Sequence, residues 1–146
     1  MPAQAEQQGG RAGSGLTPAD PPLVAVRRFG RDLGEVGAAR AWIGEMLAQR
    51  DLLGPDETGE VLVAVSELVG NVLAHTDSQP VVAIGSDETR IRVEVRDEAQ
   101  ERPYVVAPGS REIGGLGLRL VDELSESWGI NGLGTGKAVW FTVARS

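Results

Sequence analysis

The sequence predicts an α+β fold, a two-layer sandwich in which a mixed, mostly antiparallel sheet is covered on one face by helices. Two long segments have helical periodicity, several short ones alternate with a period of two, and turn residues join most neighbouring β segments. With 146 residues, 41% of them apolar, the chain is long enough to form one domain with a hydrophobic core. Aromatic residues make up only 4%, so we expect Val, Leu, Ile and Ala to form that core.

Composition excludes several classes of function. A net charge of −7 argues against direct binding of nucleic acid or of an anionic membrane, because both need clustered Lys and Arg. The chain has no cysteine and one histidine, His75, which excludes thiolate chemistry and histidine-based zinc clusters. It contains neither a run of about 18 apolar residues nor a signal pattern. The expected location is therefore the cytoplasm.

The first third of the chain predicts a tail, a strand and a helix. Met1–Pro22 is rich in Gly, Gln, Ala, Ser and Pro, which is typical of a disordered tail, so the domain is expected over 23–146. Leu23–Phe29 alternates as a strand does, and Leu33–Arg50 has apolar residues near helical spacing. Asp56, after a Gly-Pro turn, is a candidate N-cap for the next helix.

The next helix includes Val61–Thr76, whose two sides differ. One side of the helix carries an apolar stripe. On the other side, Glu67 and Asn71 are four residues apart and therefore lie next to each other. Small residues flank the pair at Ala64, Gly70 and Ala74, so a ligand could approach the backbone closely. The alternative is a partly exposed helix with a chance pair. The apolar stripe that predicts packing on a core comprises Val61, Leu62, Val65, Leu68, Val69, Val72 and Leu73.

Two strands are predicted next, at Val81–Gly85 and Arg90–Asp97, joined by a short polar turn. The second alternates cleanly between apolar and charged residues, and Asp97 is in phase with the apolar set. A carboxylate on the core side of a strand costs free energy unless it is paired, so Asp97 is a candidate site residue. The alternative is that the strand ends before Asp97, which then begins a turn.

Glu98–Ile113 is predicted to be a long loop, and loops of this length in compact domains are often functional lids. Gly114–Leu118 then opens a helix that continues to about Glu126. Glycines before a helix start expose backbone N–H groups that suit a phosphate, although a flexible loop end is the alternative. Ser127–Asn131 and Lys137–Val143 are expected to form a final hairpin.

Together these motifs resemble the Bergerat-fold (GHKL) ATPase superfamily, which includes gyrase B, Hsp90 and histidine kinases. The chain is most similar to the RsbW-like and SpoIIAB-like anti-sigma-factor serine kinases. SELVGNVLAHT matches their N box, VRDEAQERP lies at the G1 position, and GGLGLRLVDELSESWG matches the G2 region. GTGKAVWF resembles their last hairpin, so the match extends over roughly Leu23–Val143. The resemblance implies a histidine kinase-like ATP-binding domain with the Bergerat fold.

The resemblance also implies roles for individual residues. Glu67 would be the general base, Asn71 would coordinate Mg²⁺ at the triphosphate, and Asp97 would receive the exocyclic amine of adenine. For His75 a structural role is expected, and a place near the nucleotide is the alternative. For Lys137 a structural role or a weak phosphate contact is expected. The ATP-binding residues that the G2 match implies are Gly115, Leu116, Gly117 and Leu118.

By the same resemblance, the protein is expected to bind ATP and Mg²⁺, to phosphorylate a Ser or Thr of a STAS-type anti-anti-sigma partner, and to sequester a sigma factor. Homodimers are typical of such proteins. The stretch after Asp97 departs from the superfamily pattern because it lacks the glycines of Asp-x-Gly-x-Gly. The alternative function is therefore a module, ATP-bound or nucleotide-free, that binds a sigma factor or another partner without kinase turnover.

Overall fold

The computed structural model of the protein describes residues 20–98, 115–132 and 135–145. The predicted succession of strands and helices is confirmed there, with element ends shifted by a few residues. The tail and the loop predicted over 98–113 lie almost entirely outside the described residues. In chain order the elements are β2 (Leu23–Arg28), α1 (Gly34–Gln49), α2 (Pro55–His75), β3 (Val81–Ser86), β4 (Arg90–Asp97), α3 (Gly115–Leu124), β5 (Ser127–Gly132) and β6 (Lys137–Ala144).

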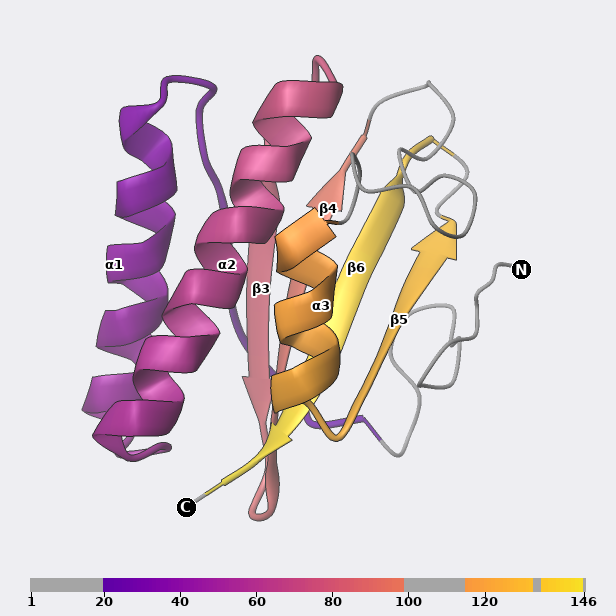
Figure 1. The fold of residues 1–146 in the computed structure, drawn as a ribbon. Coiled ribbons are helices and arrows are strands. Elements are labelled where there is room, and N and C mark those ends of the chain that lie inside the picture. Colours follow the sequence, from indigo (N-terminus) through magenta and orange to yellow (C-terminus); the bar gives the residue numbers. More distant parts are fainter. Residues whose placement is uncertain (1–19, 99–114, 133–134, 146) are drawn as a thin grey trace.

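The five strands form one sheet in the order β2-β3-β4-β6-β5, and each neighbouring pair is antiparallel. The three helices lie side by side on one face, with α2 between α1 and α3 (Figure 1). The predicted two-layer fold class is thus confirmed. None of the helices in the described ranges combines the length and the apolar character needed to cross a membrane.

Helix α2 is more deeply buried than its sequence pattern indicates. The predicted stripe does pack on the sheet, but Ala64, expected on the opposite side, is fully buried as well. The reason is that α2 is flanked on both sides, by α1 and by α3, so its buried surface is wider than one stripe. Leu62 and Leu73 at the margin of the stripe are only partly buried.

The predicted N-cap of α2 is wrong. Gly54 occupies the N-cap position in an extended conformation, and Pro55 is the first helical residue. The Gly54 carbonyl oxygen accepts a hydrogen bond from the Thr58 amide at 2.9 Å. Proline suits this position because its fixed φ is helical and its missing N–H would have had no partner. Asp56 instead lies in the first turn, where its charge is favourable to the helix dipole.

The sheet face away from the helices carries a buried ion cluster on β4. Glu94 forms ion pairs with Arg92 at 2.7 Å and with Arg96 at 3.0 Å. The Arg92 guanidinium also lies 5.0 Å from the ring centroid of Trp140 on β6. The alternation predicted for this strand is therefore confirmed, but its charged residues are not a solvated face, since Arg92 and Glu94 are 6% and 7% exposed.

Among the described strands, β2 lies at one edge of the sheet, and it is irregular at its start. The pairing with β3 shifts register between Leu23 and Ala25, which marks a bulge. Before the bulge, the Pro22 carbonyl oxygen accepts a hydrogen bond from the Ser86 amide at 3.0 Å. A Cβ atom on Gly85 would lie 2.7 Å from that same carbonyl oxygen, so the chain entering β2 passes closely over β3.

Candidate functional site

Glu67 and Asn71 lie on the side of α2 that faces α3. Glu60 on α2 and Leu124 on α3 line a common cavity, which fixes the orientation of that side. At 3.6 residues per turn, positions 67 and 71 lie within roughly 20° of Glu60 around the helix axis. Glu67 is exposed and Asn71 is partly buried.

Gly70, next to this pair, has open space beside it. A Cβ atom at this position would meet no heavy atom within 4 Å in the part of the chain that the structure describes. Close packing within the described protein therefore does not explain why a glycine stands here, although glycine costs about 1 kcal/mol against alanine in a helix. Room for a bound group along this turn is consistent with the small residues noted in the sequence.

Asp97 is the last residue of β4 and is buried, being 2% exposed. It is paired in register with Lys137, the first residue of β6, and the Lys137 Nζ donates a hydrogen bond to Asp97 Oδ2 at 2.5 Å. The interpretation of Asp97 as a core-side carboxylate at a strand end is confirmed, and the alternative that it begins a turn is wrong. An ammonium group provides the charge partner that a buried carboxylate requires.

Lys137 is as buried as its partner, at 2% exposure. Burial lowers the pKa of Lys137 from its ordinary value, while the hydrogen bond and the charge of Asp97 oppose that shift. The preceding residue, Gly136, has a φ of +149°, and a Cβ atom there would overlap the carbonyl oxygen of Asp97. The main chain of β6 is thereby held against the end of β4, which positions the two charged groups.

The glycines of the G2 region begin α3. Gly115 is the first residue of that helix, and Gly117 follows within its first turn, whereas Gly114 lies outside the described residues. The first N–H groups of a helix have no partner within the helix and suit an anion. Leu118, predicted as a backbone contact for ATP, also packs its side chain against the core.

The elements that carry the candidate site residues lie close together. Figure 1 shows the start of α3, the end of β4 and the start of β6 at the same end of the sheet as the C-terminal half of α2. Helix α2 contacts both α3 and β4. The structure thus brings the elements that carry Asn71, Asp97 and Gly115 together, although they are far apart in the sequence. Single-residue roles at this end remain predictions.

Glu98, the first residue of the predicted loop, contacts two other parts of the fold. Glu98 forms an exposed ion pair with Arg28 of β2 at 3.3 Å, and its amide donates a hydrogen bond to Ser78 Oγ at 2.8 Å. Arg28 therefore partly balances the negative charge that follows Asp97. Arg102 and Arg111, the cations expected in the lid, lie outside the described residues. His75 is the last residue of α2 and is exposed.

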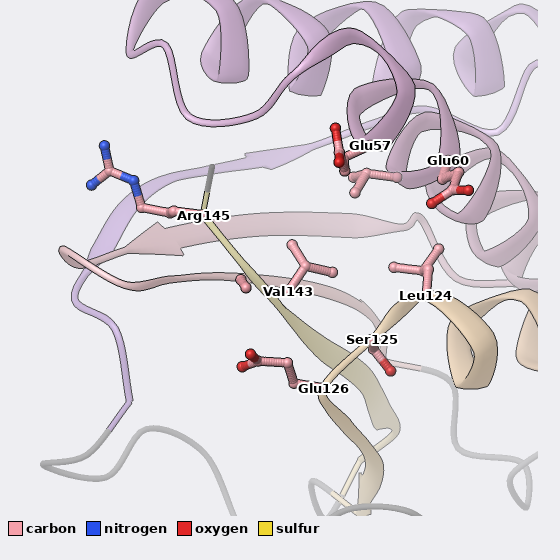
Figure 2. A pocket seen from close by; sticks show the side chains of 9 residues that line it. Glu57, Glu60, Leu124, Ser125, Glu126, Val143 and Arg145 are labelled. Carbon is pink, nitrogen blue, oxygen red and sulfur yellow. The ribbon is translucent and has the colours of Figure 1, made fainter.

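A separate cavity of about 330 Å³ lies at the opposite end of α2. Figure 2 shows Glu57 and Glu60 at the start of α2, Leu124 at the end of α3 and Glu126 beyond it, while the Arg145 guanidinium group points away from these carboxylates. The cavity shares the α2–α3 side with Glu67 but contains none of the predicted site residues. Nor do the described residues include any group of three His, Asp or Glu side chains that could hold a metal ion.

Sequence reasoning missed the contact between Asp97 and Lys137. It placed both residues at strand ends but assigned the lysine only a structural or weak phosphate role. The available signal was composition, because Lys137 is the single lysine of a chain whose other thirteen cationic side chains are arginines. Arginine stays charged when buried, whereas lysine readily changes its pKa, so the two are not interchangeable.

Comparison with known proteins defines the class. The family of histidine kinase-like ATPase domains matches residues 29–143, and the chain belongs to this family. The match includes α2, β4, α3 and β6, and so every element that carries a predicted site residue. Membership supports the expectation that this chain binds ATP. No curated protein is similar enough in sequence to count as a relative.

Among solved structures, the fold is similar to "The crystal structure of the RsbU and RsbW domains of Rv1364c from Mycobacterium tuberculosis". The TM-score is 0.64 at 18% sequence identity, over 86% of this chain and 33% of that chain. This chain thus spans a third of the length of its structural neighbour. At this identity the likeness shows a shared fold, in agreement with the family match.

Proposed function

We propose that the protein is an ATP-binding regulator of the anti-sigma type, a kinase that phosphorylates a Ser or Thr of a STAS-type partner and sequesters a sigma factor in the alternative state. The observation that carries the proposal is the family match over residues 29–143, which includes the elements that carry Glu67, Asn71 and Asp97. The RsbW domain named in the structural neighbour supports the regulatory class.

In this proposal the nucleotide is held mainly by backbone and by few side chains. Asp97 accepts a hydrogen bond from the exocyclic amine of adenine, and the first N–H groups of α3, from Gly115 to Leu118, face the phosphates. Such binding needs no cluster of Lys and Arg, so it is compatible with a net charge of −7. The sequence motifs and the meeting of these elements support this arrangement.

The residues present fit a magnesium ion that arrives with the nucleotide. Mg²⁺ in ATP sites keeps several waters and takes one or two protein oxygens in addition to the phosphates. Asn71 offers one such oxygen, while the described chain has no cluster of three potential ligands that could bind a metal unaided. The ion would neutralise charge that develops on the phosphates during transfer.

In this proposal Glu67 acts as the general base. Its carboxylate is exposed, one helical turn before Asn71, and so is accessible to a hydroxyl group of a second protein. In the proposed reaction Glu67 accepts the proton of that hydroxyl as its oxygen forms a bond to the γ-phosphorus. The bond from this phosphorus to the bridging oxygen breaks, and ADP leaves.

The alternative is a binding module without kinase turnover. The specific observation in its favour is the glycine-free stretch after Asp97, together with the engagement of Asp97 by Lys137 and of Glu98 by Arg28. A carboxylate already paired within the protein can be a structural group rather than a ligand for adenine. In that case a partner protein would be bound by the same fold with no phosphate transferred.

The decisive experiment measures nucleotide binding and then phosphate transfer. ATP·Mg²⁺ is expected to raise the melting temperature, and radiolabel from γ-labelled ATP is expected on a STAS-type partner encoded beside the gene. Glu67→Gln should retain binding but lose labelling, whereas Glu60→Gln, two turns earlier on the same side of α2, should keep both. If ATP binds and no partner is labelled, the alternative holds. If ATP does not change the melting temperature, the proposed function is wrong.

A further inference from the structure

The sheet face away from the helices is buried, although the described helices lie on the other face (Figure 1). We call it the outer face, and its central side chains are each exposed by 7% or less. Side chains as large as these would contact water on an uncovered antiparallel sheet. Within one chain, such burial requires a covering segment that the described helices do not supply. The central side chains are those of Arg92, Glu94, Asn131, Trp140 and Thr142.

Four nitrogen atoms on the outer face are buried donors that find no acceptor among the described residues. They are Nε1 of Trp140, Nδ2 of Asn131 and the Nε atoms of Arg92 and Arg96. The register places them on three adjacent strands, β4, β6 and β5. A buried donor without a partner costs about 1–3 kcal/mol. Four of them on one face therefore indicate that the covering segment supplies acceptors.

The chain reaches β2 by crossing the outer face. A Cβ atom on Gly85 would lie 2.7 Å from the carbonyl oxygen of Pro22 and 2.9 Å from that of Pro21. Gly85 pairs with Arg92 of β4, so this Cβ atom would point to the outer face. Pro21 is itself buried. The main chain thus passes over β3 and then enters β2 at the edge, so residues 1–19 precede a segment that already lies on this face.

The segment 1–19 has the length and the chemistry to cover the donors. Three strand spacings separate β3 from β5, about 14 Å in all, and five extended residues span about 17 Å. Every residue of the segment has a carbonyl oxygen that can accept a hydrogen bond. The segment 99–114 is the other long candidate, but it leads to α3 on the helix-covered face. Continuity of the chain therefore favours 1–19.

We propose that residues 1–19 lie across the outer face of the sheet and that their carbonyl oxygens accept hydrogen bonds from Trp140, Asn131 and the arginines of β4. The outer face is then a docking surface for the chain's own N-terminal segment. The charge there agrees with this, because two arginines share the single carboxylate of Glu94 and their remaining N–H groups need acceptors. This inference does not depend on nucleotide binding.

The test uses the full chain without nucleotide and exploits the absence of native cysteine. Ser14→Cys carries a nitroxide spin label, and the indole N–H signals of the three tryptophans report where the label lies. Trp140 is on the outer face, whereas Trp42 is on α1 and Trp128 bonds to Asp122 of α3. The label should broaden the Trp140 signal strongly and the other two much less, because the broadening falls steeply with distance.

Two controls make the result specific. A label at Arg50→Cys, at the end of α1, should spare the Trp140 signal. The diamagnetic analogue of the label on Ser14→Cys should leave the Trp140 chemical shift unchanged, which shows that docking tolerates the label. Trp140→Phe assigns the signal.

Two outcomes would overturn the inference. One is a label at position 14 that broadens the Trp140 signal no more than the Trp128 signal. The other comes from a mixture of ¹⁵N protein without a spin label and spin-labelled protein without ¹⁵N. Broadening of Trp140 in that mixture would mean that a second copy covers the face. Either outcome leaves the proposed function standing, since no nucleotide is present.

Discussion

Two buried ion clusters lie on opposite faces of the same sheet, and they are built differently. On the helix-covered face, one carboxylate meets one ammonium group, and both the Asp97 and the Lys137 side chain are 3% exposed. On the other face, Glu94 lies between Arg92 and Arg96, and the outer arginine is 37% exposed. The Asp97–Lys137 pair carries no net charge and is closed to water, and we call it the sealed pair. The group of Glu94 and its two arginines has an excess positive charge and contact with water.

The comparison shows what each cluster is suited for. Removing a charge from water costs several kcal/mol, so a sealed pair tolerates the loss of either partner badly. A cluster with a solvated member and a neighbouring aromatic ring can redistribute its charge, because water and the Trp140 ring offer alternative contacts. The sealed pair is therefore the more costly of the two clusters to break.

The largest effect is expected when the sealed pair is broken. Lys137→Met should lower the free energy of unfolding by about 3–5 kcal/mol, since the buried Asp97 carboxylate loses the hydrogen-bond donor that a lysine side chain supplies in either protonation state. The measurement is urea unfolding without nucleotide. The double variant Lys137→Met/Asp97→Leu is expected to recover most of that loss. A cost below about 1 kcal/mol for the single variant would mean that Asp97 is not sealed.

The second prediction concerns the backbone that holds this pair. Gly136→Ala is expected to cost about 2–3 kcal/mol, because φ is +149° and the added Cβ atom would overlap the end of β4. Gly132→Ala in the same hairpin is the matched control, as its Cβ atom would meet nothing within 4 Å among the described residues. Equal melting temperatures for the two variants would contradict the proposed contact between strands.

A smaller effect is expected on the opposite face. Glu94→Gln should cost about 1–2 kcal/mol, since it leaves two guanidinium groups without their shared carboxylate but in reach of other contacts. Glu88→Gln, in the exposed turn before β4, is the control and should be nearly neutral. If Glu94→Gln destabilises the protein as much as Lys137→Met does, the two clusters do not differ as described.

The smallest effect is a dependence of stability on alkaline pH. Burial lowers the pKa of Lys137 in the folded protein, so the unfolded chain binds more protons between that lowered value and the usual lysine pKa of about 10.4. The free energy of unfolding should therefore rise with pH across this interval. Lys137→Met should lack this rise, whereas Glu94→Gln should keep it because arginine does not titrate there. Denaturant unfolding at several pH values measures the slope.

The sequence predicted much of the fold because its periods are regular. The alternation in Arg90–Asp97 was sufficient to assign the aspartate to the core side of its strand, and the stripe in Val61–Thr76 predicted the central helix. Sequence reasoning failed at the start of α2, where the favourable chemistry of Asp56 as a cap was outweighed by proline at the first helical position.

Pairings across strands could not be predicted in the same way. Asp97 and Lys137 are 40 residues apart, and their contact depends on the register of β4 against β6, which neither strand's pattern encodes alone. Burial of Arg92 and Glu94 was missed because charged residues that alternate with apolar ones are typical of a solvated face. The roles of Glu67, Asn71 and the α3 glycines are predictions that nucleotide-binding measurements would test.

The irregular start of β2 has a consequence for how the protein behaves at high concentration. An exposed edge strand is a template onto which other chains can add, and regular edges promote aggregation. Here Pro21 and Pro22 supply no N–H groups, and the bulge that follows breaks the repeat of hydrogen bonds. Arg27 and Arg28 add like charges along the same edge, so strand addition from a second molecule is disfavoured at this side of the sheet.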